Sequence, residues 1–172
     1  MYRDNRQGFT LLEVLIALLV FSLGLLGMAG LLAVSVQTNH SAYLRTQATF
    51  LAQGMADRMR ANNLGLWNLA YNGTYNSGTA GTASGCLDTV SCGWQAVATR
   101  DTTVWSNQLV SFLPSPVANI NCATTGTAPT ASEKVERPPY NGQCTIAITW
   151  NEQTANQKQA AHPTTLTWVF QP

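Results

Sequence analysis

Charge is scarce in this sequence. Asp, Glu, Lys and Arg together make up 10 % of the 172 residues, and the formal net charge is +1. A protein that binds nucleic acid or a polyacidic partner carries a clustered basic surface, so neither partner is expected. Thr, Ser, Asn, Gln and Gly are abundant instead, a composition typical of exported bacterial surface proteins.

Histidine is also scarce, and no catalytic motif is present. His40 and His162 are isolated, and the cysteines lack the paired short spacings of zinc ligands. No Gly-x-Ser-x-Gly motif marks a nucleophile, and His162 is expected to start a strand rather than act as a base. The sequence therefore predicts no enzyme, no metal site and no cofactor. A membrane-anchored exported enzyme is the less favoured alternative.

The longest uncharged segment runs from Val14 to Val36. Its 23 residues are enough to cross a bilayer as an α-helix, which takes about 20. A secretory signal peptide has a shorter apolar region and a small-residue cleavage site, so cleavage after this segment is not expected. Arg3 and Arg6 favour a cytoplasmic N-terminus, so the rest of the chain is expected on the periplasmic side of the inner membrane.

Proline is absent from Phe9 to Leu113, so no proline kinks the apolar segment. Three glycines recur there at every third position, Gly24, Gly27 and Gly30. Small residues allow close packing of membrane helices. Each glycine also weakens a helix by roughly 0.5–1 kcal/mol, so the segment could loosen when it leaves the lipid. The sequence leaves both interpretations open.

One carboxylate stands at the start of the apolar segment. Residues 8–13 read GFTLLE, directly after a short polar leader that contains two arginines. This stretch resembles the type III signal of type IV pilins and pseudopilins. The resemblance implies that a prepilin peptidase cuts between Gly8 and Phe9, that the new amine of Phe9 is methylated, and that Glu13 is retained.

A physical role for Glu13 follows from that resemblance. Cleavage puts an ammonium group on Phe9, and this charge becomes buried when the apolar helices of a filament pack side by side. A buried charge costs several kcal/mol unless it is paired, so we predict that Glu13 pairs with such an amine during assembly. The simpler alternative is that Glu13 only complements the helix dipole.

An amphipathic helix is predicted to follow over residues 37–63. Its apolar stripe consists of Leu44, Ala48, Leu51, Met55 and Met59. The other faces carry Arg45, Thr49, Gln53, Asp57 and Arg60. Asp57 can meet Arg60 one turn later. Asn62, Asn63 and Gly65 predict the end of the helix.

The stretch LAQGMADRMRANN, residues 51–63, narrows the resemblance. It is similar to the end of this helix in minor pilins of the PilV type, and GFTLLEVLIALLVFSLGLLGMAGL fits the same group. The resemblance covers about the first third of the chain. It implies a low-abundance type IV pilin with a binding role, in initiating pilus assembly or at the pilus tip. Its implied partners are other minor pilins, the major pilin, the prepilin peptidase, inner-membrane lipid and a tip adhesin.

The nearest alternative is the minor pseudopilin of a type II secretion system, of the GspI type, which opens almost identically. Only the part of the chain after the helix can separate the two. The expected organisation is the same for both: a leader at 1–8, a transmembrane and assembly helix at 9–36, its amphipathic continuation at 37–63, and a globular head at 64–172.

The expected head is of the α+β class, with an antiparallel sheet. Residues 72–92 are rich in Gly, Ser and Thr and are expected to form a loop. Asp101 or Thr102 is expected to cap a short helix that Pro114 ends. Residues 144–153 and 162–171 are rich in β-branched residues and predict two strands of a terminal hairpin.

Four cysteines, Cys86, Cys92, Cys122 and Cys144, lie in the part predicted to be exported, where disulfides form readily. We favour Cys86 with Cys92 as a clamp across the loop. Cys122 would then pair with Cys144, joining the region after the short helix to the first strand. The sequence alone does not fix this choice.

Overall fold

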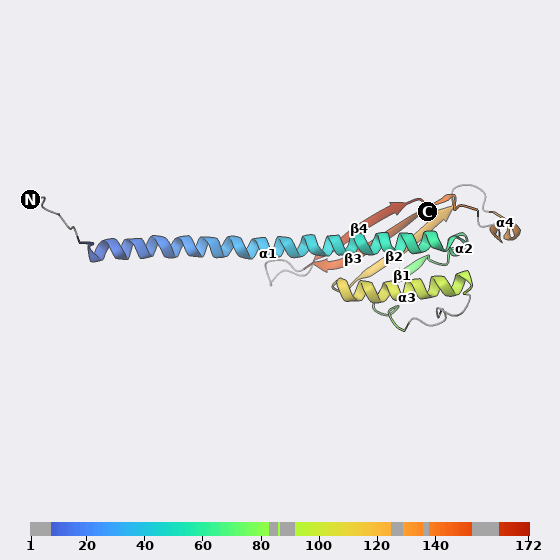
Figure 1. The fold of residues 1–172 in the computed structure, drawn as a ribbon, viewed down its shortest axis with the longest axis horizontal. Helices are drawn as coiled ribbons and strands as arrows, with labels where there is room; N and C mark the ends of the chain where they lie inside the picture. The colour runs from blue at the N-terminus through green and yellow to red at the C-terminus, as the bar shows by residue number, and fades with distance from the viewer. Residues whose placement is uncertain (1–7, 83–85, 87–91, 125–128, 136–137, 153–161) are drawn as a thin grey trace, which may run out of the picture. The chain divides into compact units, whose positions relative to one another are not determined.

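The computed structural model describes residues 8–82, 86, 92–124, 129–135, 138–152 and 162–172. The chain divides into two compact units, Met1–His40 and Ser41–Pro172. Helix α1 (Leu11–Ala61) contributes residues to both units. We call Ser41–Pro172 the head unit, because the C-terminal part of α1 shares its core with the sheet (Figure 1).

Within the head unit, α1 buries one stripe of side chains. The predicted stripe is confirmed, since Leu44, Ala48, Leu51, Met55 and Met59 are all buried. The predicted end of the helix is confirmed as well. α1 ends at Ala61, and the short helix α2 (Asn63–Trp67) follows after Asn62, whose side-chain oxygen accepts a hydrogen bond from the Gly65 N–H at 3.2 Å.

The head unit contains four antiparallel strands in the order β1-β2-β3-β4. They are β1 (Gly73–Tyr75), β2 (Val117–Thr124), β3 (Gly142–Glu152) and β4 (His162–Phe170). The predicted terminal hairpin is confirmed: β3 pairs with β4 from Cys144 opposite Phe170 to Glu152 opposite His162. Two strands were not expected, and β1 lies inside the segment 72–92 that was predicted as a loop.

One face of the sheet forms the core together with the helices. Alternate residues of the two central strands are buried there, among them Ile120, Ile146 and Ile148. Helix α3 (Trp94–Phe112) lies beside the C-terminal part of α1 (Figure 1). The buried Trp105 of α3 joins the two helices, because its Nε1–H donates to the Leu51 carbonyl at 2.9 Å. The α+β fold with a long N-terminal helix is therefore confirmed.

Helix α3 begins earlier than the sequence suggested. The expectation that Asp101 or Thr102 caps it is wrong, because the helix starts at Trp94 and Gly93 occupies the N-cap position. Asp101 instead makes tertiary contacts: its carboxylate accepts a hydrogen bond from the Tyr71 hydroxyl at 2.9 Å. A further short helix, α4 (Ala131–Val135), lies between β2 and β3 in the chain.

Candidate processing and assembly site

The predicted processing site lies just before helix α1. Gly8, Phe9 and Thr10 precede the helix and are exposed. Thr10 forms the start of α1, since its carbonyl and its Oγ1 both accept the Glu13 N–H, at 3.1 and 3.3 Å. This bond satisfies one of the free donors at a helix N-terminus. Threonine is a preferred N-cap residue, but this role of Thr10 was not predicted from the sequence.

The apolar side chains of the first unit are exposed. Phe9 is 85 % exposed, and every Leu, Ile, Val, Phe and Met from Leu11 to Val36 is at least 48 % exposed. Such a surface requires lipid or other apolar side chains around it. Among the described helices, α1 is long and apolar enough to span a membrane. Its surface therefore suits both a bilayer and the interior of a helical filament.

Glu13 is the single charged residue from Phe9 to Val36. It shares a shallow groove on α1 with Phe9, Val14 and Phe21. When lipid or neighbouring helices cover this surface, the carboxylate loses its hydration and needs a cation nearby. The glycines of the same segment stand in open space, because a Cβ at Gly24, Gly27 or Gly30 meets nothing within 4 Å.

The four cysteines form two disulfides, both in the head unit. Cys122 and Cys144 are opposite each other in the register of β2 and β3, and their Cα atoms are 4.0 Å apart. Cys86 is bonded to Cys92. These are the two pairings that the sequence favoured.

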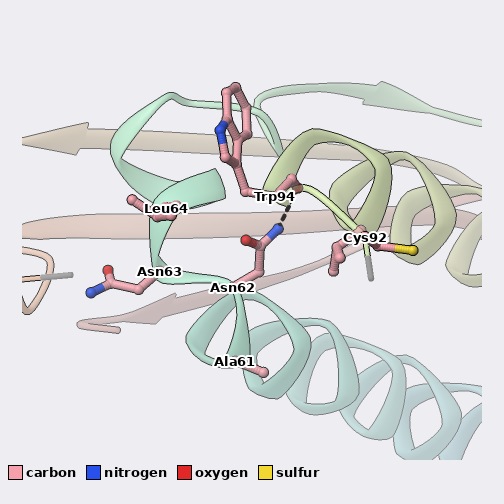
Figure 2. Close-up of a pocket in the computed structure, with 7 residues that line it drawn as sticks. Ala61, Asn62, Asn63, Leu64, Cys92 and Trp94 are labelled. Carbon is pink, nitrogen blue, oxygen red and sulfur yellow. Dashed lines mark hydrogen bonds between the residues drawn. The ribbon is translucent and has the colours of Figure 1, made fainter. Parts of the chain in front are cut away.

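A polar network lies at the end of α1 in the head unit. The Asn62 amide donates to the Tyr71 hydroxyl at 3.0 Å and to the Trp94 carbonyl at 2.8 Å (Figure 2). Asp101 accepts from Tyr71 and forms an ion pair with Arg58 at 3.4 Å. Burial raises the pKa of Tyr71, the Asn62 hydrogen bond lowers it, and the Asp101 charge raises it further. The network fixes α1, α2 and α3 relative to one another.

A cavity of about 200 Å³ adjoins this network (Figure 2). Its lining comprises Ala61, Asn62, Asn63, Leu64, Cys92, Trp94 and Val97. The Asn62 and Asn63 amides are already bonded, Asn63 to the Pro138 carbonyl. The lining offers no free acid, base or nucleophile. In the described part of the chain, no group of His, Cys, Asp or Glu side chains is placed to hold a metal ion.

Two protein-family models match the chain. Residues 3–29 match the prokaryotic N-terminal methylation motif, and residues 30–103 match the model described as Type IV pilin Tt1218. The two matches adjoin and end inside α3, well beyond the first third of the chain that carried the sequence resemblance. No curated protein and no solved structure gave a significant match.

Proposed function

We propose that the chain is a minor type IV pilin that takes part in initiating pilus assembly or forms part of the tip complex. The proposal is supported by the matches of residues 3–29 to the methylation motif and of residues 30–103 to the type IV pilin model. Its methylation motif implies processing by prepilin peptidase, and its apolar helix is consistent with an inner-membrane prepilin that assembles with other pilins. Pilins are structural proteins, so the activity proposed is binding.

The exposed apolar surface of the first unit carries this proposal. A helical segment whose large apolar side chains are all exposed from Phe9 to Val36, with one carboxylate at its start, is suited to move from lipid into a bundle of like helices. Prepilin peptidase would cut the exposed bond between Gly8 and Phe9. The Phe9 amine, methylated in this family, would then pair with a Glu13 carboxylate in the assembly.

The minor role is supported by the stretch LAQGMADRMRANN at residues 51–63, which is similar to minor pilins of the PilV type. In the structure residues 51–61 form the last part of α1, and Asn62 and Asn63 begin α2. The Leu51, Met55 and Met59 side chains are buried in the head unit. The part of the chain that resembles minor pilins therefore contributes to the core of the head unit. A tip adhesin would be a further partner of that head.

Deletion of the gene in its native host tests the proposal. We expect loss of surface pili, restored by the full-length chain, while type II secretion continues. Mass spectrometry of sheared filaments should find a mature chain that begins at a methylated Phe9. A chain that still begins at Met1, or that is cut beyond Val36, would remove the basis of the proposal.

The second candidate is a minor pseudopilin of a type II secretion system. The N-terminal motif favours it equally, because both classes share that motif. The same deletion strain separates the two: lost secretion with normal piliation selects the pseudopilin. Neighbouring genes provide an independent check, since other minor pilins and a large adhesin accompany a pilus, whereas a secretin and a secretion ATPase of a type II system accompany secretion.

A further inference from the structure

A groove on the head unit lies between the C-terminal part of α1 and helix α3, which run side by side in Figure 1. Its volume is about 240 Å³. The lining combines two aromatic rings, two amides, a glycine and a guanidinium group. These residues are Phe50, Phe112, Gln47, Gln108, Gly54 and Arg58, and the buried Leu51 completes the lining.

Gly54 lines this groove in the interior of α1, and packing within the head unit does not explain it. A Cβ at this position meets nothing within 4 Å. Glycine inside a helix is less favourable than alanine, so alanine would stabilise the isolated head unit better. A glycine is needed where something else must approach the helix backbone closely.

The walls of the groove are apolar and exposed. Phe50 is 63 % and Phe112 is 45 % exposed. Tyr43, 51 % exposed, lies two turns before Phe50 on the same side of α1, so the apolar surface continues along the helix. Exposed aromatic side chains around an open floor are typical of a site that receives an apolar side chain from a partner.

Arg58 supplies the polar end of the groove, one helical turn after Gly54. Its side chain is 33 % exposed, and its contact with Asp101 is long, at 3.4 Å. Among the described residues this is the one hydrogen bond that the Arg58 guanidinium makes. A guanidinium has five N–H donors, so most of them are left for an acceptor, and a carboxylate gives the strongest bond.

We propose that this groove binds a helix of a different pilin-family subunit. A large apolar side chain of that helix sits over Gly54 between Phe50 and Phe112, and a carboxylate three or four residues away binds Arg58. The spacing follows from helix geometry, because one turn of about 5.4 Å separates Gly54 from Arg58, and residues three or four apart on the partner helix span the same length. The inference rests on the proposed function, which supplies the neighbouring subunit.

A second copy of this chain is the weaker match. Its Glu13 carboxylate is paired with the Phe9 amine in the proposed assembly. Its described head carboxylates already have partners within the chain: Asp57, Asp101 and Glu152 are each paired with an arginine. Glu133 accepts hydrogen bonds from the Thr130 backbone and hydroxyl. The acidic group that Arg58 binds is therefore assigned to another subunit.

Photocrosslinking in assembled pili tests the identity of the partner. The full-length chain is expressed in its native host with p-benzoylphenylalanine in place of Phe50, and the crosslinked peptide is identified by mass spectrometry. We expect a peptide from a different pilin-family subunit, with an acidic residue three or four positions from a large apolar one. Crosslinks to the chain's own copies, to a protein outside the pilin family, or to no protein at all would overturn the inference.

The variant Gly54→Gln tests the groove without harming the fold. The open space at Gly54 accommodates the new side chain, so the melting temperature should stay the same or rise, while crosslinking from position 50 should fall by about tenfold or more. Thr99→Gln is the control, since Thr99 is exposed on α3 and does not line the groove, and it should leave crosslinking unchanged.

Unchanged crosslinking by a folded Gly54→Gln chain would show that the groove is not the contact. Failure of the proposed function looks different. In that case the wild-type chain itself does not co-purify with pilins, with or without a substitution at Gly54.

Discussion

The two units of the chain differ in the exposure of their large apolar side chains. In Met1–His40 the large apolar residues from Phe9 to Val36 are exposed, whereas Met55, Trp105 and Ile146 of the head unit are at most 1 % exposed. The head unit is stabilised by its own core and by two disulfides. The first unit depends on lipid or neighbouring subunits to cover it. Substitutions in the first unit should therefore affect assembly, and substitutions in the core of the head unit should affect folding.

The largest expected effect on assembly comes from Glu13→Gln. The change keeps the size and helix propensity of the side chain and removes only its charge. Loss of one member of a buried ion pair typically costs about 3–5 kcal/mol, which weakens association by a factor of roughly several hundred or more. The measurements are recovery of the processed variant with partner pilins after mild detergent extraction, and surface piliation in a strain that lacks the wild-type copy.

Processing at Gly8 and the melting temperature of the head unit serve as internal controls for Glu13→Gln, and both should match the wild type. If the processed variant assembles normally, Glu13 contributes only to the helix dipole, a much smaller term of about 0.3–1 kcal/mol.

The second largest effect is expected from the disulfides, and it should be confined to the head unit. The double substitution of Cys122 and Cys144 by alanine should lower the free energy of unfolding by about 2–4 kcal/mol, because the bridge restricts the unfolded chain. The Cys86–Cys92 bridge should contribute less, since it closes a loop with a sequence separation of 6 rather than 22. Chemical denaturation followed by tryptophan fluorescence measures both, with peptidase processing as the control.

Thiol counting on denatured protein checks the oxidised state directly. We expect no reactive thiol in chain taken from the periplasmic side. Four reactive thiols there would mean that the bridges do not form in the cell.

Alkaline pH should destabilise the head unit progressively above pH 10. Burial raises the pKa of Tyr75 from 10.0 to about 12 and that of Tyr71 further. Between pH 10 and 12 the unfolded chain therefore loses protons that the folded head unit keeps. Stability should be unaffected by these tyrosines below pH 10 and should then fall by about 1.4 kcal/mol per pH unit for each of them.

Thermal melts at pH 9, 10, 11 and 12 measure this loss, and Tyr75→Phe is the matched control. Phenylalanine cannot ionise, so the decline should become about half as steep, although the hydrogen bond from the Tyr75 hydroxyl to the Tyr71 carbonyl is also lost. If the stability of Tyr75→Phe falls as steeply with pH as that of the wild type, groups other than Tyr75 cause the alkaline loss of stability.

Local periodicity explains which parts of the fold the sequence predicted. The apolar stripe from Leu44 to Met59 repeats at helical spacing, and β3 and β4 are rich in β-branched residues. These local patterns predict a helix and two strands without knowledge of the elements they pack against. Strand β1 is different, because it consists of only three residues, all paired with β2. The adjoining Asn72 side chain continues the pairing by bonding both the N–H and the carbonyl of Cys122, at 2.9 and 3.1 Å. Contacts between residues so distant in sequence leave no local pattern.

The start of α3 was also mispredicted because of contacts between residues that are distant in the sequence. Asp101 has the chemistry of an N-cap residue, but its carboxylate instead accepts a hydrogen bond from Tyr71, in the turn after α2, and pairs with Arg58 of α1. In the site, Gly8, Phe9 and Glu13 were identified from a motif of fixed spacing, which is local by nature. The groove at Gly54 was not predicted, since the sequence shows a glycine inside a helix but not that Phe112 lies beside it.

The smallest effect is expected from Asp57→Asn, which removes a carboxylate charge from α1 just as Glu13→Gln does. Asp57 lies in the head unit, its side chain is 73 % exposed, and it pairs with Arg60 at 2.9 Å. Exposed pairs of this kind on a helix contribute about 0.3–0.5 kcal/mol, and Arg60 keeps its second contact over the Phe170 ring, 5.1 Å from the centroid. The unfolding free energy should change by no more than about 0.5 kcal/mol, and recovery with partner pilins should equal that of the wild type. If Asp57→Asn impairs assembly as strongly as Glu13→Gln, the loss of any charge on α1 is enough, and the contrast between the two units does not explain assembly.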